Sequence, residues 1–301
     1  MTQINLRDGR ELIIRAKVIE GDISEIFEGT LSNPPAVVEH KEIRTRYERI
    51  MDRESGHNSK PVLVKIAKDR EFNDLIERDV SVLGQLHPEN PSEPSSFHKY
   101  YPTSYGGIGV LVDGKQAHIF EEIKGCVTLD TVLKAYPKGI DYRDMAWMFK
   151  RSLVGMWYAH KHKVIHGAIL PPHILLTLED HGGRIVDWSY STPTRIKVPA
   201  MVTTYEDFYP PEVLHSEPAR EGTDLYMMAK CVQALLGGDL KTKEYPDSVP
   251  EPIRDLLGLC LNENVNMRPI DASEVHDTFD RLLKEVVGKP KFRPFTLPEF
   301  I

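Results

Sequence analysis

In the N-terminal third of the chain, hydrophobic and polar residues alternate with the period of two that is typical of β-strands. The alternation runs through residues 10–19 and 24–31, and a short apolar run follows at 61–67. Residues 98–121 show the same pattern in two halves, which are joined at 112–115 by a turn sequence that contains Asp-Gly. Such strands bury one face and leave the other to solvent, and Asp-Gly between them favours a tight hairpin. The pattern predicts a small antiparallel sheet.

Farther along the chain, apolar residues recur every three or four positions, which predicts helices. The clearest segments are 72–86, 129–135 and 142–161. This spacing places the apolar side chains on one face of each helix. Most of the remaining chain is also predicted to be helical. A small sheet with one helix, followed by a mostly helical region, predicts an α+β fold.

Residues 33–60 interrupt the predicted sheet with an insertion that is rich in charged and turn-forming residues. Within it, residues 37–51 have the spacing of an amphipathic helix. Insertions of this size between paired strands are often functional or flexible. Two interpretations stay open, namely a solvated loop with some helix and a segment that binds a partner.

Composition narrows the class of protein. The chain has 301 residues and a net charge of −7, which gives no reason to expect nucleic acid or an anionic membrane as the main partner. No run of eighteen apolar residues could span a bilayer, and the first residues lack a signal-peptide core. The three cysteines, Cys126, Cys231 and Cys260, lack the spacing of metal ligands, and we expect core thiols in a reducing cytoplasm. Composition therefore predicts a globular cytoplasmic protein.

Two motifs in the middle of the chain carry a resemblance to a known family. The first is Val-Ile-His-Gly-Ala-Ile-Leu-Pro-Pro-His-Ile-Leu-Leu at 164–176, and the second is Asp-Trp-Ser at 187–189. They resemble the catalytic loop His-Arg-Asp-x-x-x-x-Asn and the Asp-Phe-Gly of protein kinases. His166-Gly167 is also similar to the aminoglycoside-phosphotransferase branch, but later motifs favour the eukaryotic-like Ser/Thr branch.

The replaced positions in these motifs imply loss of catalysis. Ala168 takes the place of the catalytic aspartate, and His173 takes the place of the metal-binding asparagine. A methyl group cannot accept the proton of an attacking hydroxyl, and Mg²⁺ prefers oxygen ligands to imidazole nitrogen. Gly167 replaces the arginine that anchors a phosphorylated activation segment. The resemblance therefore implies a pseudokinase in which no catalytic residue is expected.

Part of a nucleotide site is nevertheless implied by the resemblance. Lys65 matches the lysine that holds the α- and β-phosphates, with Asp79 as a shortened acidic partner. Leu63 would crowd the adenine pocket. Gly21 is the one glycine left of the phosphate loop, and an ordinary hairpin turn is the interpretation that we favour there. Asp187 is the expected ligand of a metal ion, so ATP with Mg²⁺ is the cofactor to test.

The resemblance adds contacts around the adenine ring and a set of structural residues. Phe120 would gate the back of the pocket, and backbone amides at the hinge would bind adenine. The remaining implied nucleotide contacts are Glu121, Ile123 and Leu175. The structural residues are expected to form a column of Leu83, Trp188 and His166, a hydrogen bond from Asp224 to the backbone near His166, and a buried Glu212–Arg268 ion pair.

The histidines at 160, 162 and 166 suggest a metal site by their spacing, but no cysteine or paired carboxylate accompanies them. We favour a polar helix end that leads into the turn at His166.

The implied organisation is a bilobal kinase-like fold, with an N-lobe at 1–122 and a C-lobe at 123–288. A proline-rich tail at 289–301 either docks back on the fold or serves as a partner peptide. Two functions remain open. The first is a binding or scaffold module with weak or no affinity for ATP. The second is an atypical kinase or nucleotidyl transferase that uses Lys65 and Asp187.

Overall fold

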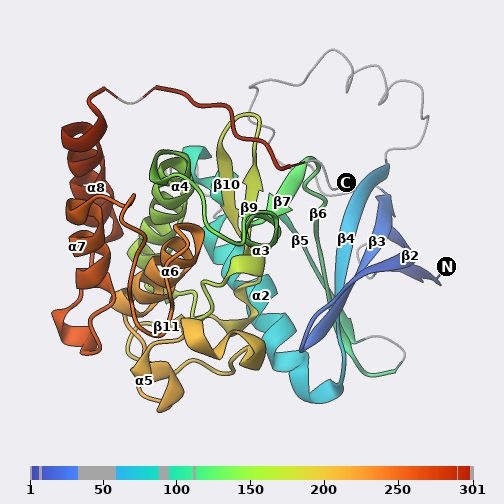
Figure 1. The fold of residues 1–301 in the computed structure, drawn as a ribbon. Coiled ribbons are helices and arrows are strands. Elements are labelled where there is room, and N and C mark those ends of the chain that lie inside the picture. The colour runs from blue at the N-terminus through green and yellow to red at the C-terminus, as the bar shows by residue number, and fades with distance from the viewer. Residues whose placement is uncertain are drawn as a thin grey trace. The chain divides into compact units, whose positions relative to one another are not determined.

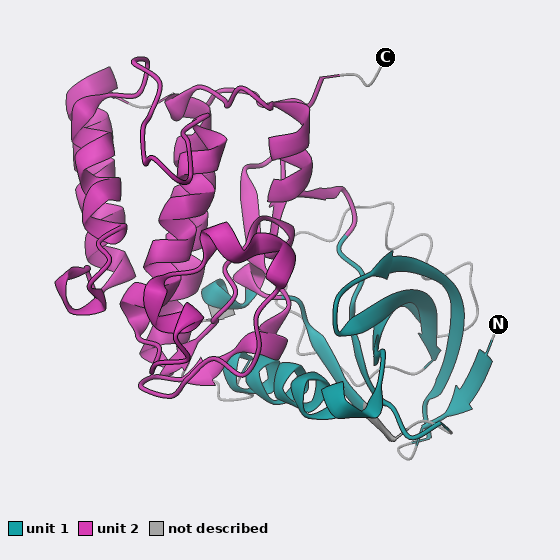
Figure 2. Cartoon of the chain, turned by 60° about the horizontal axis from the view of Figure 1, so that its bottom comes forward, with its two compact units in different colours: residues 1–98, 102–123 teal, residues 99–101, 124–301 magenta. Residues whose placement is uncertain are grey.

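The computed structural model describes residues 2–6, 9–32, 59–87, 95–110, 113–289 and 291–298. The chain divides into two compact units, drawn in teal and magenta in Figure 2. Unit 1 comprises Met1–His98 and Pro102–Ile123, and unit 2 comprises Lys99–Tyr101 and Lys124–Ile301. The predicted helix at 37–51 lies outside the described residues.

Unit 1 contains a six-stranded sheet in the order β1-β2-β3-β4-β6-β5, in which all neighbouring strands are antiparallel. The predicted sheet is therefore confirmed. β1 is an additional strand, whose single apolar residue gave no alternating pattern. The strands are β1 (Thr2–Asn5), β2 (Glu11–Glu20), β3 (Ser24–Ser32), β4 (Ser59–Ala67), β5 (Ser104–Val110) and β6 (Gln116–Glu121).

The alternation along the strands builds one apolar core beneath the sheet. Its side chains come from five strands, and neighbours two residues apart share the core face. The buried core residues are Leu12, Ile14, Leu31, Val62, Val64, Tyr105, Ala117 and Ile119. Residues at the intervening positions of β4 and β6 consequently project from the opposite face of the sheet.

In the described part of unit 1, the α-helix α2 (Asn73–Leu86) packs against β4, β5 and β6. It follows the short 3-10 helix η1 (Arg70–Phe72) and confirms the helix predicted over 72–86. A second 3-10 helix, η2 (Ser95–Tyr100), corrects the start of the strand predicted from residue 98. The reason is that Lys99–Tyr101 belong to unit 2, so the strand begins only at Ser104.

Unit 2 is mostly helical, as predicted (Figure 1). Helix α6 is buried along almost its whole length and contacts α3, α4 and α7, and α8 packs against α4 and α7. No helix in the described part of the chain is long and apolar enough to cross a membrane. The helices are α3 (Leu129–Ala135), α4 (Tyr142–Lys161), α5 (Pro211–Leu214), α6 (Glu221–Leu235), α7 (Glu251–Cys260) and α8 (Ala272–Val287).

Short strands and 3-10 helices support the central turns of unit 2. One sheet has the order β10-β9-β7, and the other pairs β11 with β8. The strands are β7 (Cys126–Thr128), β8 (Val164–Ile165), β9 (Ile174–Thr177), β10 (Gly182–Ile185) and β11 (Thr192–Pro193). The 3-10 helices are η3 (Pro171–His173), η4 (Trp188–Tyr190), η5 (Thr203–Phe208) and η6 (Val265–Met267).

Side-chain caps explain where three of the helices begin. Thr128 Oγ1 accepts a hydrogen bond from the backbone N–H of Thr131 at the start of α3. Asp141 does the same at α4, and Asp271 at α8. Such caps satisfy N–H groups that have no partner within the helix. Local sequence therefore determines these boundaries.

The tail docks back on unit 2, which is one of the two alternatives that the sequence left open. Arg293 binds Asp144 of α4 through two hydrogen bonds, at 2.6 and 3.1 Å. The hydroxyl of Tyr136 donates to the carbonyl oxygen of Thr296 at 2.6 Å, and the Phe295 side chain is buried. In Figure 1 this segment is the red strand-like trace that follows α8.

Candidate functional site

Lys65 lies in a buried polar cluster of unit 1. Because side chains alternate along β4, Lys65 projects from the face opposite to Val62 and Val64. Its Nζ lies 3.3 Å from Oδ2 of Asp79 in α2, and the two side chains are only 2% and 4% exposed. The predicted Lys65–Asp79 ion pair is confirmed, even though aspartate is one methylene shorter than the glutamate implied by the resemblance.

Asp79 has a second partner that sequence analysis missed. Nδ1 of His118 in β6 lies 2.9 Å from the same carboxylate oxygen, and Nε2 of His118 lies 2.8 Å from Oγ of Ser104. The strand register places His118 directly opposite Lys65. A carboxylate can only accept, so Nδ1 carries a proton, while the Ser104 hydroxyl can donate to Nε2. The cluster gives each of the four side chains a hydrogen-bond partner and holds the ammonium group in place.

The turn at Gly21 forms a closed hairpin between β2 and β3. The N–H of Gly21 donates to the carbonyl oxygen of Ser24 at 2.9 Å. Acidic side chains border the turn, where Glu20 and Glu25 both pair with Lys17. A phosphate group would therefore meet an amide that is already bonded within the hairpin.

Most of the residues that the resemblance implies around adenine also lie in unit 1, while Leu175 lies in unit 2. Leu63 and Phe120 are partners across β4 and β6, on the same sheet face as Lys65. The N–H of Glu121 donates to Thr103 O at 2.9 Å, so this amide does not offer adenine the hydrogen bond that the hinge prediction requires. The roles of Leu63, Phe120 and Ile123 in nucleotide binding stay predictions.

In unit 2, Asp224 of α6 holds the turn at His166. Its two carboxylate oxygens accept hydrogen bonds from the backbone N–H groups of His166 at 2.8 Å and Gly167 at 2.9 Å. His160 Nε2 lies 2.8 Å from the same carboxylate. Gly167 has a φ of 75°, and a Cβ there would lie 2.7 Å from Tyr190 O. The predicted hydrogen bond of Asp224 is confirmed, and the glycine is required by backbone geometry.

The His166 ring is neutral and fully bonded. Its Nε2–H donates to Val186 O at 3.0 Å, and its Nδ1 accepts from the N–H of Ala168 at 3.2 Å. Burial lowers the pKa of His166 to about 4. The imidazole therefore acts as a structural link between two loops and has no lone pair left for a ligand.

Trp188 packs against His166 in an edge-to-face arrangement, with ring centroids 4.5 Å apart. Its Nε1–H donates to Ile185 O at 3.2 Å. Tyr101, which sequence analysis missed, also packs edge-to-face against Trp188, with ring centroids 5.5 Å apart, and its hydroxyl donates a hydrogen bond to Gly155 O at 2.5 Å. The Trp188–His166 part of the predicted column is confirmed. Leu83 belongs to unit 1, and its place in the column stays a prediction.

Ala168 and His173, which replace the catalytic and metal-binding residues of the kinase motif, lie together in unit 2. Ala168 is fully buried, and its carbonyl oxygen accepts a hydrogen bond from Nδ1 of His173 at 2.8 Å. Nε2 of His173 lies 3.5 Å from Oδ2 of Asp187. Leu175 follows in β9, directly opposite Thr128 and Arg184 in the sheet. No carboxylate occupies position 168, so the turn contains no base at that residue.

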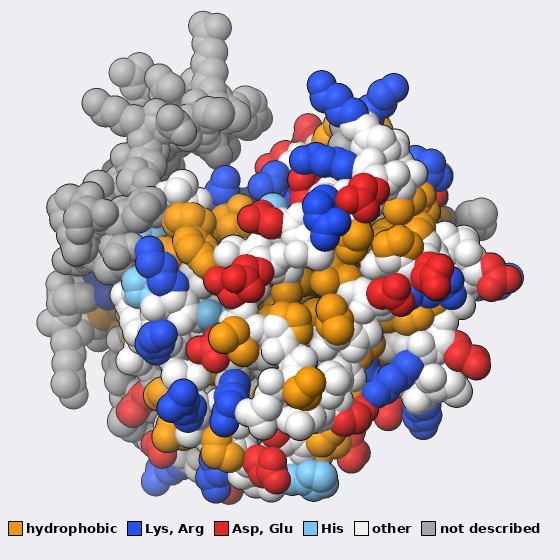
Figure 3. Space-filling model, turned by 90° about the vertical axis from the view of Figure 1, so that its left-hand side faces the viewer, with side chains coloured by type: hydrophobic (Ala, Val, Ile, Leu, Met, Phe, Trp, Pro, Cys, Tyr) orange, Lys and Arg blue, Asp and Glu red, His pale blue; other side chains and the backbone are white. Residues whose placement is uncertain are grey.

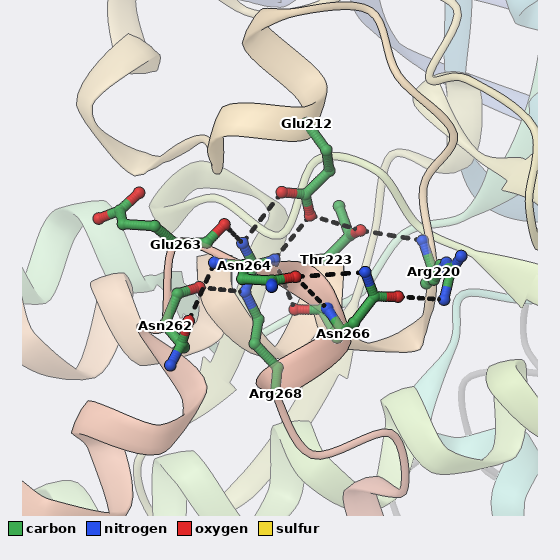
Figure 4. Close-up of polar contacts among 9 residues, drawn as sticks. Glu212, Arg220, Thr223, Asn262, Glu263, Asn264, Asn266 and Arg268 are labelled. Carbon is green, nitrogen blue, oxygen red and sulfur yellow. Dashed lines mark hydrogen bonds and ion pairs between the residues drawn. The ribbon is translucent and has the colours of Figure 1, made fainter.

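The predicted Glu212–Arg268 ion pair is confirmed and forms the centre of a larger network (Figure 4). Nη1 and Nη2 of Arg268 bind the two carboxylate oxygens at 2.6 and 3.0 Å. The other N–H groups of Arg268 donate to backbone oxygens, so all five guanidinium donors are bonded. Thr223 donates a further hydrogen bond to Glu212, at 2.8 Å. The backbone acceptors are Gly222 O, Asn262 O and Glu263 O.

Comparison with known proteins identifies kinases as relatives over part of the chain. No protein-family model matches. The chain is 30% identical over 165 residues to Aurora kinase B of Mus musculus, covering 44% of this chain and 46% of the relative. It is 25% identical over 155 residues to ribosomal protein S6 kinase alpha-1 of Mus musculus, covering 50% and 21%. It is 28% identical over 134 residues to mitogen-activated protein kinase kinase kinase 12 of Rattus norvegicus, covering 38% and 15%.

The matches span less than half the length of each of these three relatives. Their names are all those of protein kinases. The structure adds an antiparallel sheet packed against helix α2 in unit 1 and a mostly helical unit 2. The sequence similarity and this architecture together support a protein-kinase-like fold for the chain.

Proposed function

We propose that this protein is a pseudokinase that acts as a binding or scaffold module, with weak or no affinity for ATP. The observation that carries the proposal is Ala168, a buried methyl group at the position where phosphoryl transfer requires a residue that orients the nucleophile. Its backbone oxygen is bonded to His173, which ties the turn into a fixed conformation. The turn therefore resembles a kinase catalytic loop in sequence while lacking the proton acceptor.

Three further features argue against tight nucleotide binding. The N–H of Gly21 is used within its hairpin. Leu63 occupies the sheet face on which adenine would lie, next to Phe120. His173 presents nitrogen where Mg²⁺ prefers oxygen. If ATP with Mg²⁺ binds, Lys65 would hold phosphate oxygens and Asp187 the metal ion.

The expected partner is another protein. The surface of unit 2 carries large exposed hydrophobic side chains on and after α7, including Leu259, Met267 and Ile270. On the side of α7 and α8, hydrophobic side chains lie among charges of both signs (Figure 3). A mixed surface of this kind suits a protein better than nucleic acid or an anionic membrane. The cytoplasm stays the proposed location, because the buried Cys231 and Cys260 are thiols and form no disulfide, which is usual in a reducing compartment.

The test is a thermal-shift titration of the full chain with ATP, with and without Mg²⁺ and Mn²⁺. A ligand at 100 times its dissociation constant stabilises a fold by about 2.7 kcal/mol. At millimolar ATP we expect the free energy of unfolding, and with it the melting temperature, to rise by much less than such a ligand would cause. A large shift that Lys65→Ala or Asp187→Ala removes would contradict weak nucleotide binding.

The second candidate function is an atypical kinase or nucleotidyl transferase. It is favoured by one observation, the intact and buried Lys65–Asp79 pair, because phosphoryl transfer in protein kinases requires the matching lysine and its acidic partner to be in place. Phosphate or adenylate transfer by the unmodified protein, abolished by Lys65→Ala or Asp187→Ala, would establish this function and overturn the scaffold proposal. We expect both assays to stay at background.

A further inference from the structure

Ser104, His118 and Asp79 form a hydrogen-bonded chain in unit 1, in the order of nucleophile, base and orienting carboxylate that serine hydrolases use. Oγ of Ser104 lies 2.8 Å from Nε2 of His118, and Nδ1 of the same ring lies 2.9 Å from Oδ2 of Asp79. Neither Ser104 nor His118 belongs to the positions through which the chain resembles protein kinases. We propose that Ser104 is a nucleophile that small activated acyl esters modify covalently. The inference does not depend on nucleotide binding.

The charges beside His118 select the tautomer that this chemistry needs. The ammonium group of Lys65 lies 3.3 Å from Oδ2 of Asp79 and favours the ionised carboxylate, which can only accept hydrogen bonds. Nδ1 of His118 therefore carries the proton, and the lone pair of Nε2 faces the hydroxyl of Ser104. An imidazole in this state can take up the proton of a hydroxyl that attacks a carbonyl carbon.

An irregularity in the sheet aims the serine at the imidazole. In the register of β5 against β6, Ser104 lies opposite Phe120, and the register then shifts before Gly107 pairs with His118. Gly106, with a φ of 95°, lies within this irregular stretch, and its N–H donates to Oγ of Ser104 at 3.2 Å. Such bulges re-aim side chains and are frequent beside active sites. The backbone therefore holds the hydroxyl in its position against Nε2.

Ser104 is the member of the chain of hydrogen bonds that solvent reaches. It is half-buried, whereas His118 and Asp79 are 0% and 3% exposed. β5 is the outer strand of the sheet, next to β6 alone. Gly106 and Gly107 follow in the same strand and place no side chain beside the serine. These features suit a small ester better than a bulky one.

The proposed step transfers an acyl group from the ester to the serine. Oγ of Ser104 forms a bond to the carbonyl carbon while its proton passes to Nε2 of His118. The bond between that carbon and the leaving oxygen then breaks, and the proton moves from Nε2 to the leaving oxygen. The products are an O-acyl serine and an alcohol or phenol, and no further reactant is needed. Because the His118 ring is fully buried, water reaches Nε2 poorly, and we expect the acyl group to remain on Ser104.

The experiment treats the full chain with para-nitrophenyl acetate, follows the release of nitrophenolate and locates the acetyl groups by mass spectrometry of peptides. We expect a rapid phase of one equivalent per chain, with the acetyl group on Ser104. Its rate should exceed the acetylation rate of Ser81, an exposed serine of unit 1, by at least about a hundredfold, which is the lower range of general-base catalysis. Hydroxylamine cleaves serine esters and leaves lysine amides intact, so it separates this product from acetylated lysines.

The variants assign the roles. Ser104→Ala should abolish the rapid phase, and Ser81→Ala is the matched control that should leave it unchanged. His118→Gln keeps a polar side chain but cannot take up the proton, and we expect it to slow the rapid phase about a hundredfold. Asp79 acts through His118 as a positioning residue. Asp79→Asn should therefore slow the rapid phase, and Asp79→Glu, which keeps the carboxylate, should retain most of the rate.

The comparison of Ser104 with Ser81 within the unmodified chain decides the proposal even where a variant misfolds by circular dichroism. Acetylation of Ser104 no faster than that of Ser81 would overturn the proposal and leave a purely structural network. A rapid phase that survives Ser104→Ala, or one that is unchanged in folded His118→Gln, would overturn it as well.

Discussion

At His166, burial and hydrogen bonding select a single protonation state. The ring donates from Nε2 to Val186 O and accepts at Nδ1 from Ala168 N–H. A second proton would remove that acceptor and place a charge on a side chain that is only 1% exposed. Burial accordingly lowers the pKa of His166 from 6.5 to about 4. The residue that most resembles a catalytic motif in the sequence is therefore a neutral structural element.

This pKa predicts that stability falls in mild acid. Between pH 6.5 and about 4 the unfolded chain binds a proton at His166 that the folded chain does not. The neutral His166 contributes fully to the free energy of unfolding above pH 6.5. This free energy should fall by about 2 kcal/mol on going from pH 7 to pH 5. Urea unfolding at several pH values measures the slope of the free energy of unfolding against pH.

His166→Gln cannot titrate and should flatten the dependence relative to the unmodified chain. The control His215→Gln changes an exposed histidine and should keep the full slope. Parallel slopes in all three proteins would mean that other groups cause the acid sensitivity.

The buried Lys65–Asp79 pair predicts a strong penalty when one partner is removed. Asp79→Ala would leave a lysine that is 2% exposed without its carboxylate and would also deprive His118 of a partner. We expect a loss of about 3–5 kcal/mol. The double variant Lys65→Met/Asp79→Leu should cost clearly less than the sum of the single changes.

Chemical denaturation of the full chain measures these free energies. The control Ser81→Ala changes an exposed residue of the same helix and should stay within about 0.5 kcal/mol of the unmodified protein. Additive losses at 65 and 79 would argue against the contact.

At the scale of elements, the tail is a separate segment that side-chain contacts hold on unit 2. Phe292 stacks on His181 at 4.4 Å, and His181 stacks in turn on Trp147 at 4.3 Å. Phe295 packs beside Tyr136 at 5.6 Å and is buried. The prolines of the tail prevent it from continuing α8, so its position depends on these contacts with residues far away in sequence.

We expect Phe295→Ala to release the tail locally without unfolding unit 2. The substitution removes the Phe295 ring, which is the most buried side chain of the tail. Amide exchange should therefore become faster in residues 291–298 and change little in α4 and α6. Arg293→Ala should have a smaller effect, because the Arg293 and Asp144 side chains are 40% and 16% exposed and such pairs contribute about 0.2–1 kcal/mol.

Hydrogen exchange read by mass spectrometry measures both effects. Lys291→Ala alters an exposed residue of the same segment and is the matched control. Unchanged exchange in Phe295→Ala would show that the anchor lies elsewhere.

At the scale of the whole molecule, unit 2 is held together by contacts between distant parts of the chain. Glu212 and Arg268 are 56 residues apart in sequence, and their network joins α5, the start of α6 and the loop before η6. Tyr101 comes from the N-terminal part of the chain and is nevertheless part of unit 2, where it is buried against Trp188. These links make unit 2 a cooperative body.

Glu212→Ala and Arg268→Ala should each lower the free energy of unfolding by about 3–5 kcal/mol, because either change strands a buried charge. The double variant should cost much less than the sum. Chemical denaturation of the unmodified chain, the two single variants and the double variant gives the four free energies of a double-mutant cycle.

The exposed pair Arg281–Glu285 on α8, at 60% and 58% exposure, is the matched control. Its coupling should be only about 0.3–0.5 kcal/mol. Equal coupling at the two sites would contradict a special role for the buried pair.

The sequence by itself determined the elements and part of the site. Period-two and helical patterns predicted the sheet, α2 and α4, because each pattern depends on neighbours along the chain. Motif order predicted the Lys65–Asp79 and Glu212–Arg268 pairs.

Only the tertiary structure decided the rest. It placed His118 beside Asp79, Tyr101 against Trp188, and the tail on α4. It also brought Nε2 of His173 to face Asp187. These contacts depend on strand register, on backbone hydrogen bonds and on packing between segments far apart in sequence, and no local pattern of residues encodes them.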